Sequence, residues 1–173
     1  CCVVEGSLGV MQPLLQRIQA SGIQVTERPG SGLLRVGDAT LALSDGRLAS
    51  QRAREDGLRN LVLVDLALDY SKAERIAIST CPDTTREARE HAVALLRQAG
   101  LKVCLVADLP ALVVLRTVTT LANEAADAVL QGVGSAADID LAMRAGVNYP
   151  RGPLAWAEQI GIGYTLRVLD NLQ

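Results

Sequence analysis

Acid–base chemistry could come from two places in this sequence of 173 residues. His91 is the single histidine, and an imidazole titrates near neutral pH, so it is a candidate general base. Asp65 and Asp69 follow an apolar run and could form an acidic pair or hold a hard metal ion. His91, however, lies mid-helix among charged neighbours, and the aspartates have no third ligand nearby. We therefore favour a partly exposed helical histidine and a polar strand end.

The turn after the first apolar run has part of a dinucleotide-binding pattern. The full pattern, G-x-G-x-x-G, opens a helix and lets the backbone approach a pyrophosphate. Gly6 and Gly9 supply its second and third glycines, but Val4 stands at the first position and Glu5 would place a carboxylate beside the phosphates. Glu27, about where an acid would bind the ribose, does not restore the pattern. The sequence therefore predicts a degenerate Rossmann-like unit with no cofactor bound to it.

The cysteines and one group of arginines are candidates for a metal site and for a coenzyme A site, respectively. The cysteines form no C-x-x-C pair and have no histidine at ligand spacing, which predicts no metal site and reduced thiols in a cytoplasmic protein; they are Cys1, Cys2, Cys81 and Cys104. The arginines of one segment could suit the phosphates of coenzyme A; they are Arg47, Arg52, Arg54 and Arg59. Because Glu55 and Asp56 lie among them, a solvated, flexible face is favoured.

The elements that position these residues alternate between short apolar runs and amphipathic helices. Residues 1–28 predict a strand, a helix and a second strand. Further predicted strands are residues 33–36, 40–43, 61–66, 75–78 and 102–106. The third and fourth of these have the composition of buried parallel strands. Thr84 and Glu87 predict a capping box for a helix that ends near Gly100. This order of elements predicts an α/β domain.

From Leu109 onward the pattern becomes helical. Pro110 can open the first helix, because the first helical turn does not use the missing N–H. The predicted inner face comprises Val114, Val118, Leu121, Ala125, Ala128 and Val129. Gly132 and Gly134 end this helix. One of its faces is therefore built for burial.

Two more helices follow. Ser135 and Asp138 make an S-x-x-D capping box for the second, which Gly146 is expected to stop. Residues 146–153 hold two prolines and two glycines, so their backbone has little freedom. Pro153 then begins the third helix.

This helical pattern resembles the carboxy-terminal domain of the NAD-dependent 3-hydroxyacyl-CoA dehydrogenases. The family motif combines a Pro-led first helix, an N-E-A step, a D-I-D-x-A-M helix and a G-x-x-Y-P-x-G-P corner. Here these are Pro110, residues 123–125, residues 138–143 and residues 146–153, with the spacing intact. The resemblance implies an oxidoreductase that converts 3-hydroxyacyl-CoA to 3-oxoacyl-CoA with NAD.

One residue departs from the family pattern. The resemblance implies that the first helix opens with Pro-Gly-Phe-(Ile/Val)-x-Asn-Arg, with the asparagine at the active site. Leu115 stands in that place here, and a leucine cannot make the hydrogen bonds of an amide. The family's catalytic His–Glu pair also has no matching motif. We therefore expect no catalytic residue, no cofactor-binding residue and no metal ligand in this chain.

The whole chain resembles the degenerate second half of tandemly duplicated bacterial 3-hydroxyacyl-CoA dehydrogenases, including those of phenylacetate breakdown that oxidise 3-hydroxyadipyl-CoA. We expect a degenerate Rossmann-like α/β domain over residues 1–108 and an all-helical domain over residues 109–173. Since the sequence begins at Cys1 without a methionine, we read it as a piece of a longer polypeptide.

The resemblance implies that the missing amino-terminal half would hold NAD, the catalytic His and Glu and the working helical domain, with an acyl-CoA as the substrate of the parent enzyme. Helical domains of this family commonly pair, as in a homodimer, and this one would serve assembly and help to shape the acyl pocket. The alternative is a regulatory module that binds coenzyme A or a nucleotide.

Composition excludes other classes of protein. Hydrophobic residues make up 49% of the chain and the mean hydropathy is +0.22, which suits a globular protein with a substantial core. A net charge of −2 gives no basis for binding nucleic acid or an anionic membrane. No apolar run is long enough to cross a bilayer. The sequence therefore predicts a cytoplasmic protein whose ligands are small molecules or other proteins.

Overall fold

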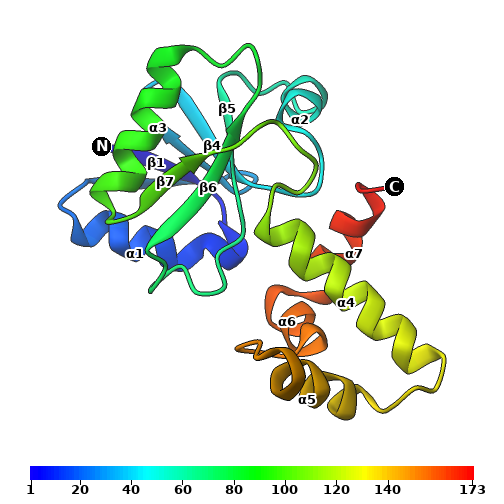
Figure 1. Ribbon diagram of the computed structural model, residues 1–173. Coiled ribbons are helices and arrows are strands. Elements are labelled where there is room, and N and C mark those ends of the chain that lie inside the picture. Colours follow the sequence, from blue (N-terminus) through cyan, green and yellow to red (C-terminus); the bar gives the residue numbers. More distant parts are fainter.

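The computed structural model describes residues 1–173 and contains a seven-stranded sheet with its own helices, followed by four further helices (Figure 1). The strands are β1 (Cys2–Glu5), β2 (Val25–Arg28), β3 (Leu33–Val36), β4 (Ala39–Leu43), β5 (Leu61–Val64), β6 (Arg75–Thr80) and β7 (Lys102–Leu105). The helices are the 3-10 turn η1 (Gly9–Met11), then α1 (Gln12–Ala20), α2 (Ala49–Glu55), α3 (Arg86–Gln98), α4 (Val114–Leu130), α5 (Ala136–Val147), α6 (Pro153–Ile160) and α7 (Ile162–Asp170).

The sheet is mixed, in the order β2-β1-β3-β4-β5-β6-β7. Three pairs are parallel, namely β1 with β2, β4 with β5 and β6 with β7, and each pair is joined through a helix. Strands β3 and β4, both predicted from the sequence, form a hairpin that turns at Gly37 and Asp38. The prediction of parallel strands is wrong for one pair, because β5 and β6 are antiparallel and a loop without a helix joins them.

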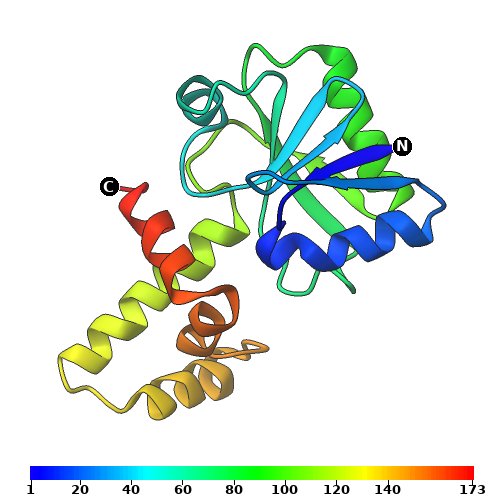
Figure 2. The ribbon, with the colours of Figure 1, turned by 180° about the vertical axis from the view of Figure 1, so that it is seen from behind.

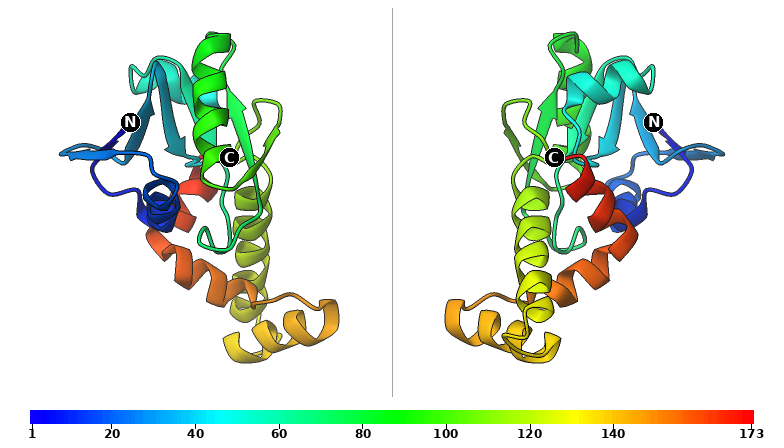
Figure 3. Two further views of the ribbon diagram at one scale, coloured as in Figure 1. Left: turned by 90° about the vertical axis from the view of Figure 1, so that its left-hand side faces the viewer. Right: turned by 90° about the vertical axis from the view of Figure 1, so that its right-hand side faces the viewer.

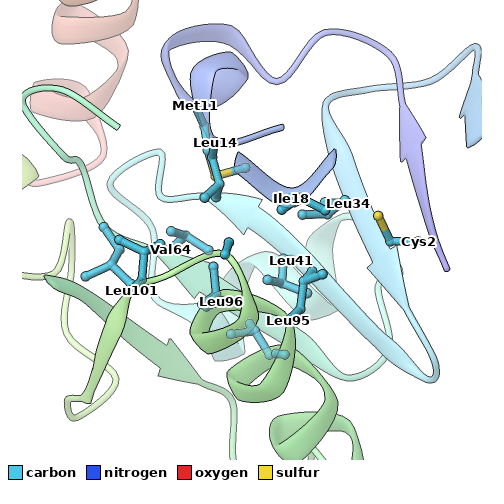
Figure 4. Packing of buried hydrophobic residues seen from close by; sticks show 14 of the residues in the cluster. Cys2, Met11, Leu14, Ile18, Leu34, Leu41, Val64, Leu95, Leu96 and Leu101 are labelled. Carbon is cyan, nitrogen blue, oxygen red and sulfur yellow. The ribbon is translucent and has the colours of Figure 1, made fainter. Parts of the chain in front are cut away.

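Apolar side chains cover both faces of this sheet, because successive residues of a strand point to opposite sides. On one face, α1 and α3 pack over the strands, with Leu14 and Ile18 of α1 and Leu96 of α3 buried against Leu41 and Val64 (Figure 4). On the other face, Ala49 of α2 and Leu112 of the connection between β7 and α4 cover Leu33, Leu61 and Leu63. These two layers hold the α/β domain together by burial of apolar surface.

The four carboxy-terminal helices form a second group, which the two opposite views show extending away from the sheet (Figures 1 and 2). Helix α4 contacts α5, α6 and α7, and its buried residues are Leu115, Val118, Thr119, Ala122 and Ala125. Val118 and Ala125 of the predicted inner face are therefore buried, whereas Val114, Leu121, Ala128 and Val129 are only half-buried. The buried stripe is rotated toward Leu115 and Ala122, which pack against the neighbouring helices.

Several helix boundaries differ from the sequence prediction. Pro110 does not open α4, since the helix begins at Val114 after two residues in the left-handed region. Thr85, and not Thr84, caps α3 by accepting from the backbone N–H of Ala88. The hydroxyl of Thr84 instead donates to the carbonyl of Leu61.

In the helical domain, two of the predicted helix boundaries are correct and one is wrong. The Ser135–Asp138 capping box is confirmed. Gly146 lies inside α5, and Asn148 ends the helix in a left-handed conformation that asparagine tolerates. Pro153 begins α6, as predicted. The sequence analysis missed α7, which Gly161 separates from α6 by a single residue with φ of 101°.

Candidate functional site

The β1–α1 turn packs against protein backbone. Gly6 has a φ of 76° and lies so close to the carbonyl of Gly30 that no side chain could be added. Its N–H donates to the carbonyl of Arg28 at 2.8 Å, and the carbonyl of Glu5 accepts from Gly32 at 2.6 Å. Gly6 therefore allows the chain to pass the β2–β3 loop, which accounts for the glycine without a pyrophosphate.

Two further donors of this turn are also occupied. The N–H of Leu8 donates to the side chain of Gln12 at 3.1 Å, and the N–H of Gly9 donates to Ser7 Oγ at 3.2 Å. Glu5 is held in an ion pair with Arg35, with 2.8 Å between Oε1 and Nε. A dinucleotide phosphate needs free backbone N–H groups at this turn. The residues present do not fit such a group, because these donors already have protein partners.

Leu115 lies in the first turn of α4 and is completely buried. Its side chain packs with Leu66, Val118 and Trp156 in the cluster that joins the helical domain to the α/β domain. The place that the resemblance assigns to an active-site asparagine is therefore occupied by a closely packed apolar side chain.

Asp65 and Asp69 do not form an acid–base pair. Asp65 ends β5 with 0% exposure, and its carboxylate accepts from four backbone N–H groups, those of Leu66, Val113, Val114 and Leu115, at 2.8 to 3.1 Å. Asp69 is exposed and accepts from the hydroxyl and N–H of Ser71, which lowers the pKa of its carboxyl group. Asp65 does lie at a strand end, as predicted, but it is a buried helix cap. Its partners are far away in sequence, so no local pattern could have revealed this role.

His91 lies half-buried in the middle of α3, as the sequence analysis favoured. Its ring packs against Gly37 in the β3–β4 turn, and its Nδ1 atom is buried without a hydrogen-bond partner. No carboxylate is hydrogen-bonded to the ring to orient it, so the geometry of a catalytic base is absent.

The four arginines considered for coenzyme A fall into two pairs. Arg47 and Arg52 form ion pairs with carboxylates of the same loop and helix, which are those of Asp45, Glu55 and Asp56. The hydrogen bonds from Arg47 lower the pKa of Glu55 and Asp56. Arg54 and Arg59 form no ion pair, and both line a cavity of about 570 Å³ between α2 and the start of α3. Only Arg54 and Arg59 therefore remain free to meet an anion.

A polar cleft of about 450 Å³ separates the α/β domain from the helical domain. Its lining includes Gly9 and Gln12 at the start of α1, Asp69 of the β5–β6 loop, and Arg151 and Gln159 of the helical domain. Arg151 belongs to the rigid corner that the sequence analysis singled out, and it forms no ion pair. The cleft holds no histidine or cysteine, and its one acidic lining residue is Asp69.

The helical domain carries exposed apolar residues around α5, the helix that lies farthest from the sheet (Figure 3). Helix α5 has no buried residue although it carries four large apolar side chains, and other large apolar side chains around it are exposed to solvent. We define the α4–α5 surface by Leu130, Val133, Leu141 and Val147, which are 85%, 72%, 60% and 54% exposed. Nearby, a groove of about 450 Å³ runs between α4, α5 and α6 and is lined mainly by apolar residues. Exposed aliphatic groups of this kind are a common property of interaction surfaces.

The comparisons with protein families match this two-part fold. Residues 41–110 match the model described as 3-hydroxybutyryl-CoA dehydrogenase reduced Rossmann-fold domain, and residues 112–173 match the 3-hydroxyacyl-CoA dehydrogenase C-terminal domain. The chain belongs to the 3-hydroxyacyl-CoA dehydrogenase family. Its fold is thus a Rossmann-like reduced domain followed by the family's helical domain, as the sequence predicted. The boundary between residues 108 and 109 stays a prediction.

Individual family members are similar over most of this chain. It is 38% identical to 3-hydroxyadipyl-CoA dehydrogenase of Escherichia coli K12, over 85% of this chain and 30% of that protein. It is 31% identical to 3-hydroxybutyryl-CoA dehydrogenase of Bradyrhizobium diazoefficiens, over 79% of this chain and 46% of that protein. The chain therefore spans less than half the length of these two family members.

Solved structures of the family have the same fold. The crystal structure of 3-hydroxybutyryl-CoA dehydrogenase from Escherichia coli K12 superposes with a TM-score of 0.77 at 37% identity, over 85% of this chain and 30% of that one. The (S)-3-hydroxybutyryl-CoA dehydrogenase from Ralstonia eutropha gives 0.63 at 23% identity, over 92% of this chain and 53% of that one, which shows the fold alone.

Other structural features bear on the remaining expectations. All four cysteines are free thiols. No three side chains of histidine, cysteine, aspartate or glutamate come together in a way that could hold a metal ion. None of the helices combines the length and the apolar character needed to span a membrane.

Proposed function

We propose that this chain is part of an NAD-dependent enzyme that oxidises 3-hydroxyacyl-CoA to 3-oxoacyl-CoA, and that this part serves assembly and shapes the acyl pocket without performing chemistry. The 38% identity to a 3-hydroxyadipyl-CoA dehydrogenase supports the reaction class. The observation that carries the assembly role is the α4–α5 surface, where Leu130 and Leu141 stand mostly in solvent.

The physical argument for assembly is the cost of exposed apolar area. Burial of aliphatic surface contributes roughly 25 cal/mol for each Å² removed from water. Helix α5 buries none of its residues within this chain, so its apolar side chains contribute little to folding here. A partner that covered Leu130, Val133 and Leu141 would remove them from water and gain that free energy.

The partner that suits this surface is another helical domain of the same family. Such a domain has an apolar face of matching geometry, since it is built from the same helices. Within a longer polypeptide it would be the helical domain of the catalytic part; otherwise it would be a second copy of this chain in a homodimer. In the first arrangement, the covered helices would border the acyl group of the substrate.

The absence of chemistry in this part is proposed from three positions. Leu115 has no amide to orient a substrate, and its surroundings are closely packed. Gly6 contacts backbone, and the N–H of Gly9 is already bonded. NAD, the catalytic residues and the acyl-CoA substrate would then be held by the rest of the enzyme.

Size-exclusion chromatography with light scattering tests the assembly role. The chain is expected to form a dimer as its concentration is raised, or to bind the catalytic part when the two are mixed. A chain that stays monomeric at every concentration and does not bind the catalytic part would refute the proposal.

A second candidate function is a regulatory module that binds coenzyme A or a nucleotide. Arg54 and Arg59 favour it, because both line the same cavity and neither has a carboxylate partner among the ion pairs. Asp83 on the same lining opposes it.

Isothermal titration with NAD, NADH and acetoacetyl-CoA separates the two functions. The assembly role predicts no heat of binding for any of them. Micromolar binding of acetoacetyl-CoA that is lost in Arg54→Gln and Arg59→Gln would support the second candidate. Turnover of a 3-hydroxyacyl-CoA substrate by this chain would contradict both.

A cytoplasmic location is part of the proposal. It is supported by the free thiols of Cys2 and Cys81, which are buried, and of Cys1 and Cys104, which are more exposed. Free thiols of both kinds persist where the compartment is reducing.

A further inference from the structure

We infer that Asp65 pins the helical domain to the sheet, so that the two domains of this chain move as one rigid body and do not open and close about their connection. This inference concerns internal motion and goes beyond the proposed function. Domain closure needs a hinge, which is a short segment whose backbone torsions are free to change. The segment between β7 and α4 is the only covalent connection between the domains, so it is where such a hinge would lie.

The first argument is the environment of Asp65. Its carboxylate is fully buried at the end of β5, and Oδ2 accepts from Val113 and Val114 while Oδ1 accepts from Leu115. The acceptor belongs to the sheet and the three donors begin α4. Moving α4 away would leave a buried charge without these partners, which is strongly unfavourable. The positive end of the helix dipole adds to the attraction.

The second argument is the conformation of the connection. Ala111 and Leu112 have φ of 56° and 55°, a region that side chains with a β-carbon rarely occupy. Both are buried, and they point into different clusters, since Ala111 packs with Leu115 and Leu112 packs with Leu63 under the sheet. Two consecutive residues in this region persist only where their surroundings fix them. The backbone torsions of Ala111 and Leu112 are therefore fixed, and the connection does not act as a hinge.

The third argument is a contact at the other end of the helical domain. The hydroxyl of Tyr164 donates to the carbonyl of Ser44, and Asn171 Nδ2 donates to the carbonyl of Asp45 at 2.8 Å. A β-carbon added to Gly46 would lie only 2.8 Å from the carbonyl oxygen of Val168. Helix α7 therefore approaches this loop closely. The helical domain is thus held at both α4 and α7, and two separated attachments prevent rotation about either one.

Urea unfolding followed by two signals tests the inference. Trp156 is the only tryptophan and lies in the helical domain, so its fluorescence reports that domain, whereas circular dichroism reports both domains. Coincident transitions indicate a single cooperative unit. For the unaltered chain we expect the two midpoints to agree. Midpoints that differ by about 1 M urea or more would overturn the inference.

Asp65→Asn keeps the size of the side chain but weakens the attachment of α4, because the amide replaces one acceptor oxygen with a donor and removes the negative charge. We expect the Trp156 transition to move to lower urea and to separate from the unfolding of the sheet. The matched control is Thr85→Ala, because Thr85 also caps a helix by accepting from a backbone N–H, that of Ala88, but that helix is α3 of the α/β domain and Thr85 lies outside the connection between the domains. The control should lower both midpoints together. Equal shifts of both midpoints in Asp65→Asn would show that Asp65 is merely structural.

Hydrogen exchange on the unaltered chain tests the same inference without a variant. The amides of Val113, Val114 and Leu115 should exchange within about tenfold of the slowest amides of β5, because both are released only by global unfolding. Exchange of these three amides about 100-fold faster than β5 would show that α4 opens by itself, and would overturn the inference.

Discussion

Leu115 and Asp65 stand where a catalytic role was conceivable from the sequence, but both residues stabilise the junction between the domains. Leu115 places an aliphatic side chain among Leu66, Val118 and Trp156, where an amide would have no partner. Asp65 uses all of its acceptor capacity on backbone N–H groups. A carboxylate saturated in this way has no free acceptor position for a substrate. At the residue scale, the junction of the two domains is organised for stability.

Restoring an amide at the junction is expected to destabilise the chain without creating activity. Leu115→Asn should cost roughly 2–4 kcal/mol of unfolding free energy, because it loses buried apolar contacts and leaves polar atoms unpaired. Urea denaturation measures the change. Leu166→Asn, at an exposed position of α7, is the control and should change stability by less than about 0.5 kcal/mol. An unchanged midpoint for Leu115→Asn would contradict the packing described here.

Two tyrosines predict a loss of stability at high pH. Burial raises the pKa of Tyr70 and of Tyr164, and their hydroxyls donate to the carbonyls of Asp65 and Ser44. A raised pKa in the folded state favours folding below the unfolded value of about 10, and that contribution is lost as the pH rises further, because only the unfolded chain ionises.

The unfolding midpoint should therefore fall between about pH 9 and 11, together with the appearance of phenolate absorbance from these side chains. Tyr164→Phe removes one ionising group and should make the fall shallower, although it lowers stability at neutral pH. The same slope in the variant and in the unaltered chain would rule out a contribution from Tyr164.

At the scale of elements, three aspartates cap helices that begin elsewhere in the chain. Asp65 caps α4, Asp108 caps α2, and Asp140 of α5 accepts from Leu154 and Ala155 at the start of α6, both at 2.9 Å. Gly152 touches the side chain of Asp140, so the glycine of the rigid corner makes room for this cap. The corner of the family motif thus acts in helix placement, which gives a physical reason for its composition.

Removing the cap of α6 tests this account. Asp140→Ala should lower the unfolding free energy by about 1 kcal/mol, the usual cost of losing a capping side chain. Asp127→Ala is a suitable control, because Asp127 is exposed on α4 and accepts only from the nearby side chain of Gln131. The two variants should be compared by thermal unfolding. If Asp127→Ala were the more destabilising, the capping role of Asp140 would be wrong.

At the scale of the whole molecule, the two domains differ in how completely their apolar side chains are buried. The sheet is covered on both faces, with Leu41 and Val64 under α1 and α3 and Leu63 under α2. The α4–α5 surface is left open at the far end of the helical domain. An incomplete surface on a rigidly held domain suits a part whose function is to receive another domain.

A charge on this surface should prevent assembly and leave folding unchanged. Leu141→Glu is expected to abolish dimer formation or binding to the catalytic part, because the partner would have to bury a carboxylate. Stability should change by less than about 0.5 kcal/mol, since Leu141 is exposed. Leu105→Glu, at an edge strand of the α/β domain with 53% exposure, is the matched control and should still assemble. Loss of assembly in both variants, or in neither, would contradict the assigned surface.

The sequence by itself determined the order of the strands and of most helices, though not α2 or α7, together with the capping box at Ser135, the start of α6 at Pro153 and the family motif of the helical domain. These features depend on residues close together in the chain. It also predicted that Gly6 and Leu115 would not serve a dehydrogenase site, and that interpretation stays a prediction. Only the tertiary structure decided that β5 and β6 are antiparallel, that α4 begins at Val114, and that Asp65 is a buried cap. The physical reason is distance along the chain: Asp65 and its partners in α4 are 48 to 50 residues apart, and such a contact leaves no local pattern.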